Sequence, residues 1–290
     1  MNNRDVFLII GGDLRQTYLS EILAQNAVVY TLGIDNNAEG KKTIALKTLE
    51  EIPEPVDYII LPLPVTNDGV NINMPFYEEK ISLYSLIPYL KHNAVVFGGK
   101  IGKESSIFTY KGFEVIDYLD REELTVLNAV PTSEGAIQIA MEELPTTIYG
   151  QKVLITGFGR ISKVMMKALN GLGAKVYVTA RKYSDLAWIK IYGCEAIHIS
   201  QIEEYLSEFD LVFNTVPAVI LDEKKLKLLK ESCLVIDLAS KPGGVDFETA
   251  KQLGIKTIWA LSLPGKVAPV TSGEIIAGTI LNILSERGEA

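Results

Sequence analysis

Short apolar runs alternate along the chain with segments in which apolar residues recur at helical spacing. In the first half, these runs predict strands at 6–10, 28–31, 58–61, 94–97 and 113–116, with a helix over 14–25. In the second half they predict strands at 153–156, 175–179, 196–198, 211–214, 234–237 and 257–260, with helices between them. This alternation is typical of strands that cross over through helices into parallel sheets.

A weak internal repeat indicates two domains of one kind. Each half opens with a strand, a glycine turn and a helix start, first at Gly11-Gly12-Asp13 and then at Gly157-Phe158-Gly159. Six strands in the second half match a complete dinucleotide-binding domain. Helical periodicity at 131–144 and 272–284 predicts two connecting helices, the second of which carries the chain back to the first domain. We therefore expect an α/β protein with two Rossmann-like, doubly wound parallel-sheet domains, joined by connecting helices with a cleft between them. The expected bounds are 1–130 plus 271–290 for a substrate or partner domain, 131–148 for a connecting helix, and 149–270 for a nucleotide-binding domain.

The segment 62–80 interrupts this alternation. It carries Pro62, Pro64, Gly69 and Pro75 among several asparagines, which predicts a long loop. Long loops in compact domains are often functional.

Composition narrows the classes of function. The formal net charge of −8 argues against nucleic-acid binding, because neutralising phosphates requires a basic face. The sequence shows no signal peptide and no apolar run long enough to span a membrane, so we expect a cytoplasmic protein. Two distant cysteines and two scattered histidines do not predict a metal site.

The strongest motif is the glycine turn of the second half, which lies between a strand and a helix. Gly157 permits a tight turn, and Gly159 lets the backbone approach a pyrophosphate at the start of the following helix. Ser162 stands where a third glycine or an alanine is usual, and it is small enough for close packing. The predicted cofactor-binding residues are Gly157, Phe158, Gly159, Arg160, Ile161, Ser162, Thr179, Ala180, Arg181, Lys182, Thr215, Val216 and Pro217.

The end of the second strand of this domain predicts the cofactor. NAD enzymes place a carboxylate there for the ribose 2′-hydroxyl. Here the residues are Thr179, Ala180, Arg181 and Lys182, so two cations stand where a carboxylate is expected. This pattern favours NADP over NAD; the alternative is that both cations are solvated surface residues.

Candidates for substrate chemistry lie at predicted strand ends, where open parallel sheets bind ligands. Arg15 follows the first glycine turn, whose Asp13 we expect to cap the helix rather than to bind a nucleotide. Ser240 and Lys241 follow the fifth strand of the second half, and Lys266 follows the sixth. Three cations on such loops suit a substrate with one or two carboxylates, although each could also be a solvated loop residue.

The start of the helix at 131–144 supplies further candidates. Glu134 is either a general base or half of a capping box with Thr132, and the capping box is the preferred interpretation. The substrate-binding candidates are Arg15, Thr132, Ser133, Ser240, Lys241 and Lys266, and the catalytic candidates are Lys241, Glu134 and Ser133.

Five motifs together resemble the A subunits of dipicolinate synthase from spore-forming bacteria. They are Gly11-Gly-Asp-Leu-Arg-Gln16, Pro131-Thr-Ser-Glu-Gly135, Gly157-Phe-Gly-Arg160, Asp237-Leu-Ala-Ser-Lys-Pro-Gly-Gly244 with Asp246-Phe247, and Leu263-Pro-Gly-Lys-Val-Ala-Pro269. The resemblance runs over nearly the whole chain, and Ser162 departs from the glycine expected in that family.

The resemblance implies a reaction. Members of this family oxidise a dihydrodipicolinate-type intermediate to dipicolinate with hydride transfer to NADP. They work with a flavoprotein-like B subunit in the mother cell during sporulation. The alternatives are another NAD(P)-dependent dehydrogenase of the alanine-dehydrogenase or 2-hydroxyacid type, and a non-catalytic NADP-binding subunit. The sequence leaves open the identity of a catalytic base and whether the chain forms a homo-oligomer.

Overall fold

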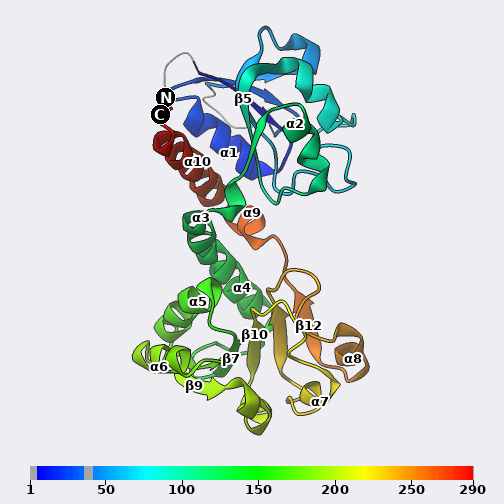
Figure 1. Ribbon diagram of the computed structural model, residues 1–290. Coiled ribbons are helices and arrows are strands. Elements are labelled where there is room, and N and C mark those ends of the chain that lie inside the picture. Colours follow the sequence, from blue (N-terminus) through cyan, green and yellow to red (C-terminus); the bar gives the residue numbers. More distant parts are fainter. Residues whose placement is uncertain (1–4, 36–41, 290) are drawn as a thin grey trace. The chain divides into compact units, whose positions relative to one another are not determined.

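The computed structural model describes residues 5–35 and 42–289 and divides into two compact units (Figure 1). Unit 1 comprises Met1–Leu127 and Ala268–Ala290, and unit 2 comprises Asn128–Val267. The expected bounds are 1–130 with 271–290, then 131–148 for the connecting helix and 149–270 for the nucleotide-binding domain. The chain therefore passes from unit 1 into unit 2 and returns.

Unit 1 is built on a parallel sheet of six strands. Its order is β3-β2-β1-β4-β5-β6, so neighbouring strands are joined by crossovers and the order reverses between β1 and β4. The strands are β1 (Val6–Ile10), β2 (Val28–Leu32), β3 (Ile44–Leu46), β4 (Val56–Ile60), β5 (Leu90–Gly98) and β6 (Glu114–Asp117).

Alternate residues of the central strands enter two cores, one on each face of the sheet. Leu8 and Ile10 of β1 belong to one core, and Phe7 and Ile9 belong to the other. The second core also contains Ile280 and other residues of α10, the last helix. This helix packs closely along α1, the first helix (Figure 1). The helices of unit 1 are α1 (Leu14–Leu23), α2 (Ser106–Tyr110), α3 (Glu122–Leu127) and α10 (Pro269–Glu286), with short 3-10 helices at Leu49–Glu51, Leu83–Tyr89, Lys103–Ser105 and Tyr118–Asp120.

Unit 2 repeats the same topology. Its sheet has the order β12-β11-β10-β7-β8-β9, all parallel, and the order reverses between β7 and β10. The strands are β7 (Lys152–Thr156), β8 (Lys175–Ala180), β9 (Glu195–His198), β10 (Leu211–Asn214), β11 (Leu234–Asp237) and β12 (Lys256–Trp259). The helices are α4 (Ala129–Glu143), α5 (Arg160–Gly171), α6 (Tyr183–Ile191), α7 (Glu223–Leu226), α8 (Phe247–Gln252) and α9 (Leu263–Val267), with 3-10 helices at Ile199–Glu204 and Leu206–Glu208. Two parallel sheets of this kind confirm the expected pair of Rossmann-like domains.

The start of α4 corrects one prediction. The helix begins at Ala129, so Thr132 lies inside it and donates its hydroxyl to the Asn128 carbonyl (2.7 Å). The expected capping box between Thr132 and Glu134 is therefore wrong. Its apparent starting residue, Pro131, stands in the first turn of the helix, where the missing N–H group leaves no intrahelical hydrogen bond unmade.

The segment after β4 is a long loop, as expected. Isolated bridges pair Thr66 with Ile72 and Asn71 with Ser82, which folds the loop back on itself. The carbonyl of Asn73 accepts a hydrogen bond from the N–H group of Gly12 (2.8 Å). The loop thus covers the first glycine turn.

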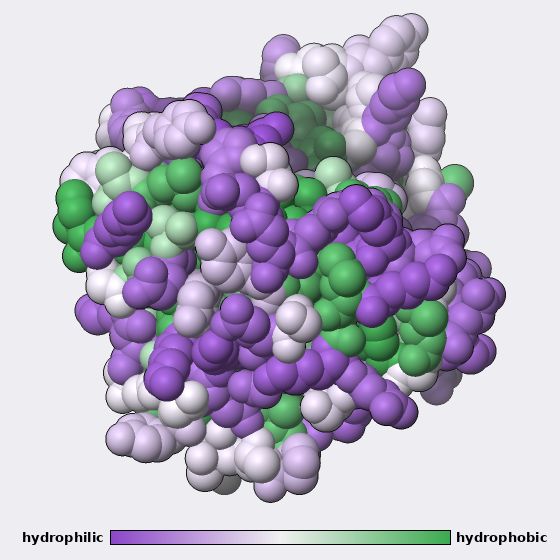
Figure 2. Space-filling model, turned by 90° about the horizontal axis from the view of Figure 1, so that it is seen from below, coloured by the Kyte–Doolittle hydropathy of each residue, from purple (hydrophilic) through white to green (hydrophobic). Residues whose placement is uncertain are grey.

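Hydrophilic side chains dominate the face shown in Figure 2, and hydrophobic side chains form separate groups between them. Exposed large apolar residues of unit 2 include Tyr149, Tyr183 and Ile191. Within the described residues, no helix is long and apolar enough to cross a membrane.

Candidate functional site

The glycine turn of unit 2 joins β7 to α5. Gly157 has a φ of +90°, a conformation that residues with side chains rarely adopt. A Cβ atom at this position would lie 2.7 Å from Cγ2 of Val216 and 2.9 Å from Oγ1 of Thr215. The N–H group of Gly157 donates to Oγ1 of the buried Thr179 (3.1 Å). The turn is thereby fixed against the ends of β8 and β10.

Gly159 leaves the start of α5 open. It is the N-cap residue, makes no side-chain cap, and a Cβ atom built there would meet nothing within 4 Å. The first turn of a helix presents N–H groups and the positive end of the helix dipole. A phosphate group can therefore approach this end of α5.

Ser162 lies in the first turn of α5. Its side chain is fully buried, and its Oγ lies 3.1 Å from Oγ1 of Thr215. Thr215 donates its own hydroxyl hydrogen to the Thr156 carbonyl (2.7 Å), so Ser162 is the donor in the first contact. The hydroxyl pair joins the helix to the end of β10.

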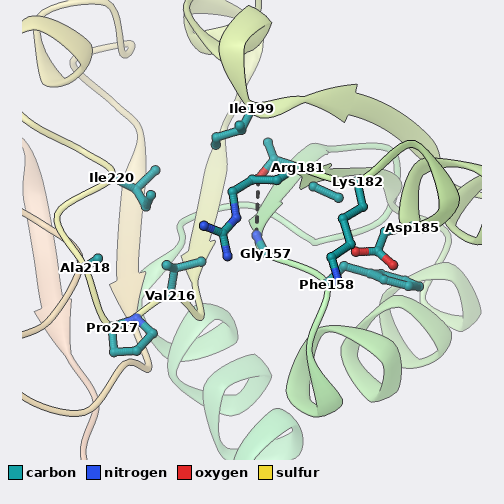
Figure 3. A pocket seen from close by; sticks show the side chains of 12 residues that line it. Gly157, Phe158, Arg181, Lys182, Asp185, Ile199, Val216, Pro217, Ala218 and Ile220 are labelled. Carbon is teal, nitrogen blue, oxygen red and sulfur yellow. Dashed lines mark hydrogen bonds between the residues drawn. The ribbon is translucent and has the colours of Figure 1, made fainter.

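A cavity of about 540 Å³ lies beside this turn (Figure 3). Arg181 and Lys182 are exposed at its rim, and within the described residues neither forms an ion pair. Figure 3 shows the guanidinium of Arg181 directed toward the side of Val216 and Pro217, whereas Lys182 extends toward Phe158 and Asp185. The lining residues are Gly157, Phe158, Thr179, Ala180, Arg181, Lys182, Asp185, Ile199, Val216, Pro217, Ala218 and Ile220.

Most of the predicted cofactor residues line this cavity. Gly159, Arg160, Ile161, Ser162 and Thr215 do not line it; they form the start of α5 and the turn beneath it. Asp185, Ile199, Ala218 and Ile220 were missed. Their signal is weak in the sequence, because they belong to three separate crossovers and only the fold brings them to the strand ends.

Asp185 changes the electrostatic picture of the cavity. It stands in the first turn of α6, where a carboxylate is favourable, and it shares the cavity with Lys182. Its negative charge offsets the charge on the Lys182 side. Arg181 is consequently the cation best placed to meet an anionic group there.

A buried polar network, also missed, shapes the ends of β10 and β11. Asn214 and Asp237 are both fully buried, and Nδ2 of Asn214 donates to Oδ1 of Asp237 (2.7 Å). The Asp237 carboxylate also accepts from the N–H groups of Ala239 (3.0 Å) and Gly244 (2.7 Å). A Cβ atom on Gly244 would lie 2.0 Å from Nδ2 of Asn214, so only glycine fits.

This network holds a loop that carries Ser240 and Lys241, both exposed. Lys266 is exposed as well, on the short helix α9. Within the described part of the chain, neither lysine forms an ion pair. Both ammonium groups can therefore bind an anionic ligand. Of the two lysines, Lys241 lies on the loop that the buried network at the end of β11 holds in place.

The first glycine turn, in unit 1, is built differently. Asp13 is the N-cap of α1, as expected, and its Oδ1 accepts the N–H group of Arg15 (3.1 Å). The guanidinium of Arg15 donates to both oxygens of the same carboxylate (2.8 Å each) and to the Leu63 carbonyl (2.8 Å). Only 9% of the Arg15 side chain is exposed, so this cation is largely neutralised where it stands.

Two further buried groups brace the same edge of unit 1. Gln16 donates its side-chain amide to the Leu61 carbonyl (3.1 Å), and the Tyr118 hydroxyl donates to the same carbonyl (3.3 Å). Burial raises the pKa of Tyr118 well above its usual value. Its hydroxyl therefore stays protonated and acts as a donor.

The candidates on α4 lie in unit 2. Ser133 is fully buried, and its hydroxyl is directed at the carbonyls of Ala129 (2.7 Å) and Ile161 (3.3 Å). This contact joins α4 to the first turn of α5. Glu134 is exposed, and Thr132 is half-buried.

The residues present fit a dinucleotide. The turn at Gly157, the open space at Gly159 and the uncapped start of α5 suit a pyrophosphate. Arg181 stands where the ribose of the adenosine half would lie. Among the described residues, no group of three or more His, Cys, Asp or Glu side chains could hold a metal ion.

Comparison with protein families matches each half of the chain. Residues 6–119 match the family described as the N-terminal domain of the A subunit of dipicolinate synthase. Residues 130–243 match the NAD binding domain of D-isomer specific 2-hydroxyacid dehydrogenases. Unit 2 is thus a nucleotide-binding domain of a dehydrogenase.

Whole-chain comparisons agree. The dipicolinate synthase A subunit of Bacillus subtilis (strain 168) is 32% identical over 282 residues, which cover 96% of this chain and 95% of that protein. The crystal structure of the dipicolinate synthase A subunit from Bacillus halodurans superposes with a TM-score of 0.90 at 31% identity, covering 98% of this chain and 99% of that one. A transhydrogenase from Sinorhizobium meliloti shares the fold, with a TM-score of 0.72 at 15% identity, covering 98% and 95% of the two chains. The chain belongs to the family of dipicolinate synthase A subunits.

Proposed function

We propose that this chain oxidises a dihydrodipicolinate-type dicarboxylate to pyridine-2,6-dicarboxylate, with NADP as the hydride acceptor. The reaction would take place in the mother cell of a sporulating bacterium, together with a flavoprotein-like B subunit. The observation that carries the proposal is the open start of α5 beside Arg181, whose guanidinium has no ion pair among the described residues, in a chain of this family.

The choice of NADP over NAD rests on the end of β8. No carboxylate stands at positions 179–182 to accept the ribose 2′-hydroxyl. Arg181 can instead donate to a 2′-phosphate, and a guanidinium matches phosphate geometry well. Asp185 follows Lys182 by three residues, and its negative charge offsets the positive charge of Lys182. We therefore assign the 2′-phosphate to Arg181.

The oxidation removes two hydrogens from the dihydropyridine ring. One would leave with its electron pair as hydride, for which NADP held at the start of α5 would be the acceptor, and the other would leave as a proton. Because the product is aromatic, the step is strongly favoured and the protein's main contribution is to position the ring. This is consistent with a site that has no histidine among the candidates.

Lys241 is our preferred catalytic and substrate-binding residue. It follows a strand end, is exposed and has no ion pair among the described residues. Its ammonium would hydrogen-bond a substrate carboxylate, with Ser240 and Lys266 as further contacts. Arg15 retains guanidinium hydrogens beyond those given to Asp13 and Leu63, and we propose that they hydrogen-bond a substrate carboxylate.

The roles proposed on α4 are more limited. Thr132 and the exposed Glu134 stay proposed contacts at the start of α4, Glu134 as a proton acceptor. Ser133 is assigned to positioning the start of α5 through the Ile161 carbonyl.

A coupled assay tests the proposal. The condensation product of pyruvate and aspartate semialdehyde is supplied with NADP, with and without the B subunit. We expect reduced cofactor and pyridine-2,6-dicarboxylate to form in equal amounts. Cofactor binding without any turnover, even with the B subunit, would identify a non-catalytic NADP-binding subunit. Turnover of alanine or a 2-hydroxyacid instead would place the chain with other dehydrogenases.

A further inference from the structure

Two residues other than glycine have left-handed backbone conformations within the described chain. Lys100 has a φ of +58° and Ser262 a φ of +59°. Lys100 follows β5 in unit 1, and Ser262 follows β12 in unit 2. Both therefore lie beyond the carboxyl ends of parallel strands, where sheets of this type bind ligands. Such strained residues persist only where the surrounding structure enforces them, and they gather at functional sites.

The surroundings of Lys100 enforce its conformation. The Asp117 carboxylate accepts the N–H groups of Lys100 (3.2 Å) and Ile101 (2.7 Å). The preceding Gly99 is closely packed, since a Cβ atom there would lie 2.6 Å from the Tyr118 ring. The turn cannot relax without losing these contacts, and it leaves Lys100 exposed.

Lys100 and Arg15 flank the same loop segment. The Leu63 carbonyl accepts from Arg15 (2.8 Å), and a Cβ atom on Gly99 would lie 2.9 Å from Cβ of Leu63. The N–H group of Gly99 also donates to the Pro62 carbonyl (3.4 Å). Both cations thus belong to one edge of unit 1, at the ends of β1, β4 and β5.

Arg15 and Lys100 differ in whether their charged groups already have a partner in the protein. Both oxygens of Asp13 accept from Arg15, so the pair is neutral as a whole. The ammonium of Lys100 has no hydrogen bond or ion pair within the described residues. Lys100, rather than Arg15, therefore has a charged group that can pair with a ligand at this edge, on a turn held by the Asp117 carboxylate.

We propose that Lys100 is a substrate-binding residue whose ammonium holds one carboxylate of an anionic, dicarboxylate ligand. The inference rests on the proposed function for the nature of that ligand. Arg15 then supplies directed hydrogen bonds, and Lys100 supplies the net charge. The strained turn presents the lysine at a fixed position instead of leaving it on a mobile surface loop.

The first test is a matched pair of variants, Lys100→Met and Lys103→Met. Lys103 is an exposed lysine three residues further on, so both changes alter the net charge equally. Binding of pyridine-2,6-dicarboxylate is measured by calorimetry, and turnover is measured with the B subunit present. We expect Lys100→Met to raise the Kd of the dicarboxylate and the KM at least about tenfold. The Kd of NADP should stay within about twofold, and Lys103→Met should match the wild type.

A second variant separates binding from folding. Lys100→Gly relieves the left-handed strain, so we expect its Tm to rise by about 2 °C or more while dicarboxylate binding falls as in Lys100→Met. Wild-type dicarboxylate affinity in both variants would overturn the inference. A wild-type protein that binds the dicarboxylate through Lys100 but never oxidises a dihydropyridine would overturn the proposed function alone.

Discussion

The two glycine turns of this chain occupy the same place in two sheets of the same strand order, yet only one can receive a phosphate. In unit 1, Asp13 caps α1 and the Asn73 carbonyl accepts from Gly12, so protein groups already satisfy the helix start. In unit 2, Gly159 begins α5 with no side-chain cap and open space around it. The N-cap residue thus determines whether a side chain of the protein caps the first N–H groups of the helix or whether they stay open to a phosphate.

The arginines near the two glycine turns differ in the same way. Arg15, the second residue of α1, forms an ion pair with Asp13, and its side chain is 9% exposed. Arg181, at the rim of the cavity in unit 2, has no ion pair among the described residues. Repetition of a fold therefore does not repeat its electrostatics.

Gly159→Asp gives α5 of unit 2 the kind of N-cap that Asp13 provides for α1 in unit 1. We expect this variant to have the largest effect on NADP binding. Gly159 has extended backbone angles and room for a side chain, so the variant should fold. Its carboxylate would cap α5 and repel the pyrophosphate, and we expect NADP affinity to fall by at least ~300-fold. Calorimetry measures this, with Gly159→Ala as the neutral control. Retention of wild-type affinity would mean that the pyrophosphate does not lie at α5.

Arg181→Ala tests the unpaired cation. Loss of a charge-assisted contact to the 2′-phosphate should cost about 1.5–3 kcal/mol of NADP binding. NAD binding should change little, so the preference for NADP should nearly disappear. Lys182→Ala should cost less, because Asp185 shares its side of the cavity. Equal affinity of the wild type for both cofactors would refute the assignment.

Much of this comparison was predictable from the sequence, because it depends on local patterns. Apolar runs located the strands of both sheets, and the glycine turns stood out beside them. The exception is β3, a three-residue strand, Ile44–Leu46, at the edge of its sheet with two exposed residues. Its apolar run is only three residues long, which is too short to distinguish a strand from a loop.

The rest depends on contacts between distant segments. Nothing local shows that Asn214 meets Asp237, or that the Arg15 guanidinium reaches the Leu63 carbonyl. The one signal was a polar residue at the last position of two buried strands, β10 and β11. The start of α4 was misplaced because Pro131 resembles a first helical residue, although the first turn tolerates it further in.

The substitutions Lys241→Ala and Arg15→Ala compare an exposed cation of unit 2 with a buried cation of unit 1. We expect each to lower kcat/KM at least about tenfold, or about 1.4 kcal/mol in the transition state, with NADP affinity nearly unchanged. Lys241→Ala should leave the Tm unchanged because the side chain is exposed without an ion pair. Arg15→Ala should lower the Tm as well, since it leaves Asp13 without its partner. Thermal unfolding and steady-state kinetics, the latter with the B subunit present, measure these effects; wild-type efficiency in both variants would contradict the dicarboxylate contacts.

Asp13→Ala should weaken unit 1 by about 1 kcal/mol, the usual cost of losing an N-cap. The lost ion pair adds to this cost, because the Arg15 side chain is only 9% exposed and, among the described residues, keeps only the Leu63 carbonyl as a partner. Asp13→Asn keeps the capping oxygen and should cost less than half as much. Urea unfolding followed by circular dichroism makes the comparison. An asparagine variant as unstable as the alanine variant would show that the ion pair matters more than the cap.

Ser162→Ala should have the smallest effect and completes the comparison of the two helix starts. Ser162 is buried at the base of α5, and its hydroxyl donates to Thr215 (3.1 Å) rather than facing the cavity. Alanine keeps the close packing that this position needs. Thr215 keeps its own bond to the Thr156 carbonyl, so no buried donor is left unpaired. We therefore expect a loss of about 0.5–1 kcal/mol in the free energy of unfolding, with NADP affinity within about twofold of the wild type. A tenfold loss of NADP affinity would instead place the Ser162 hydroxyl in contact with the cofactor.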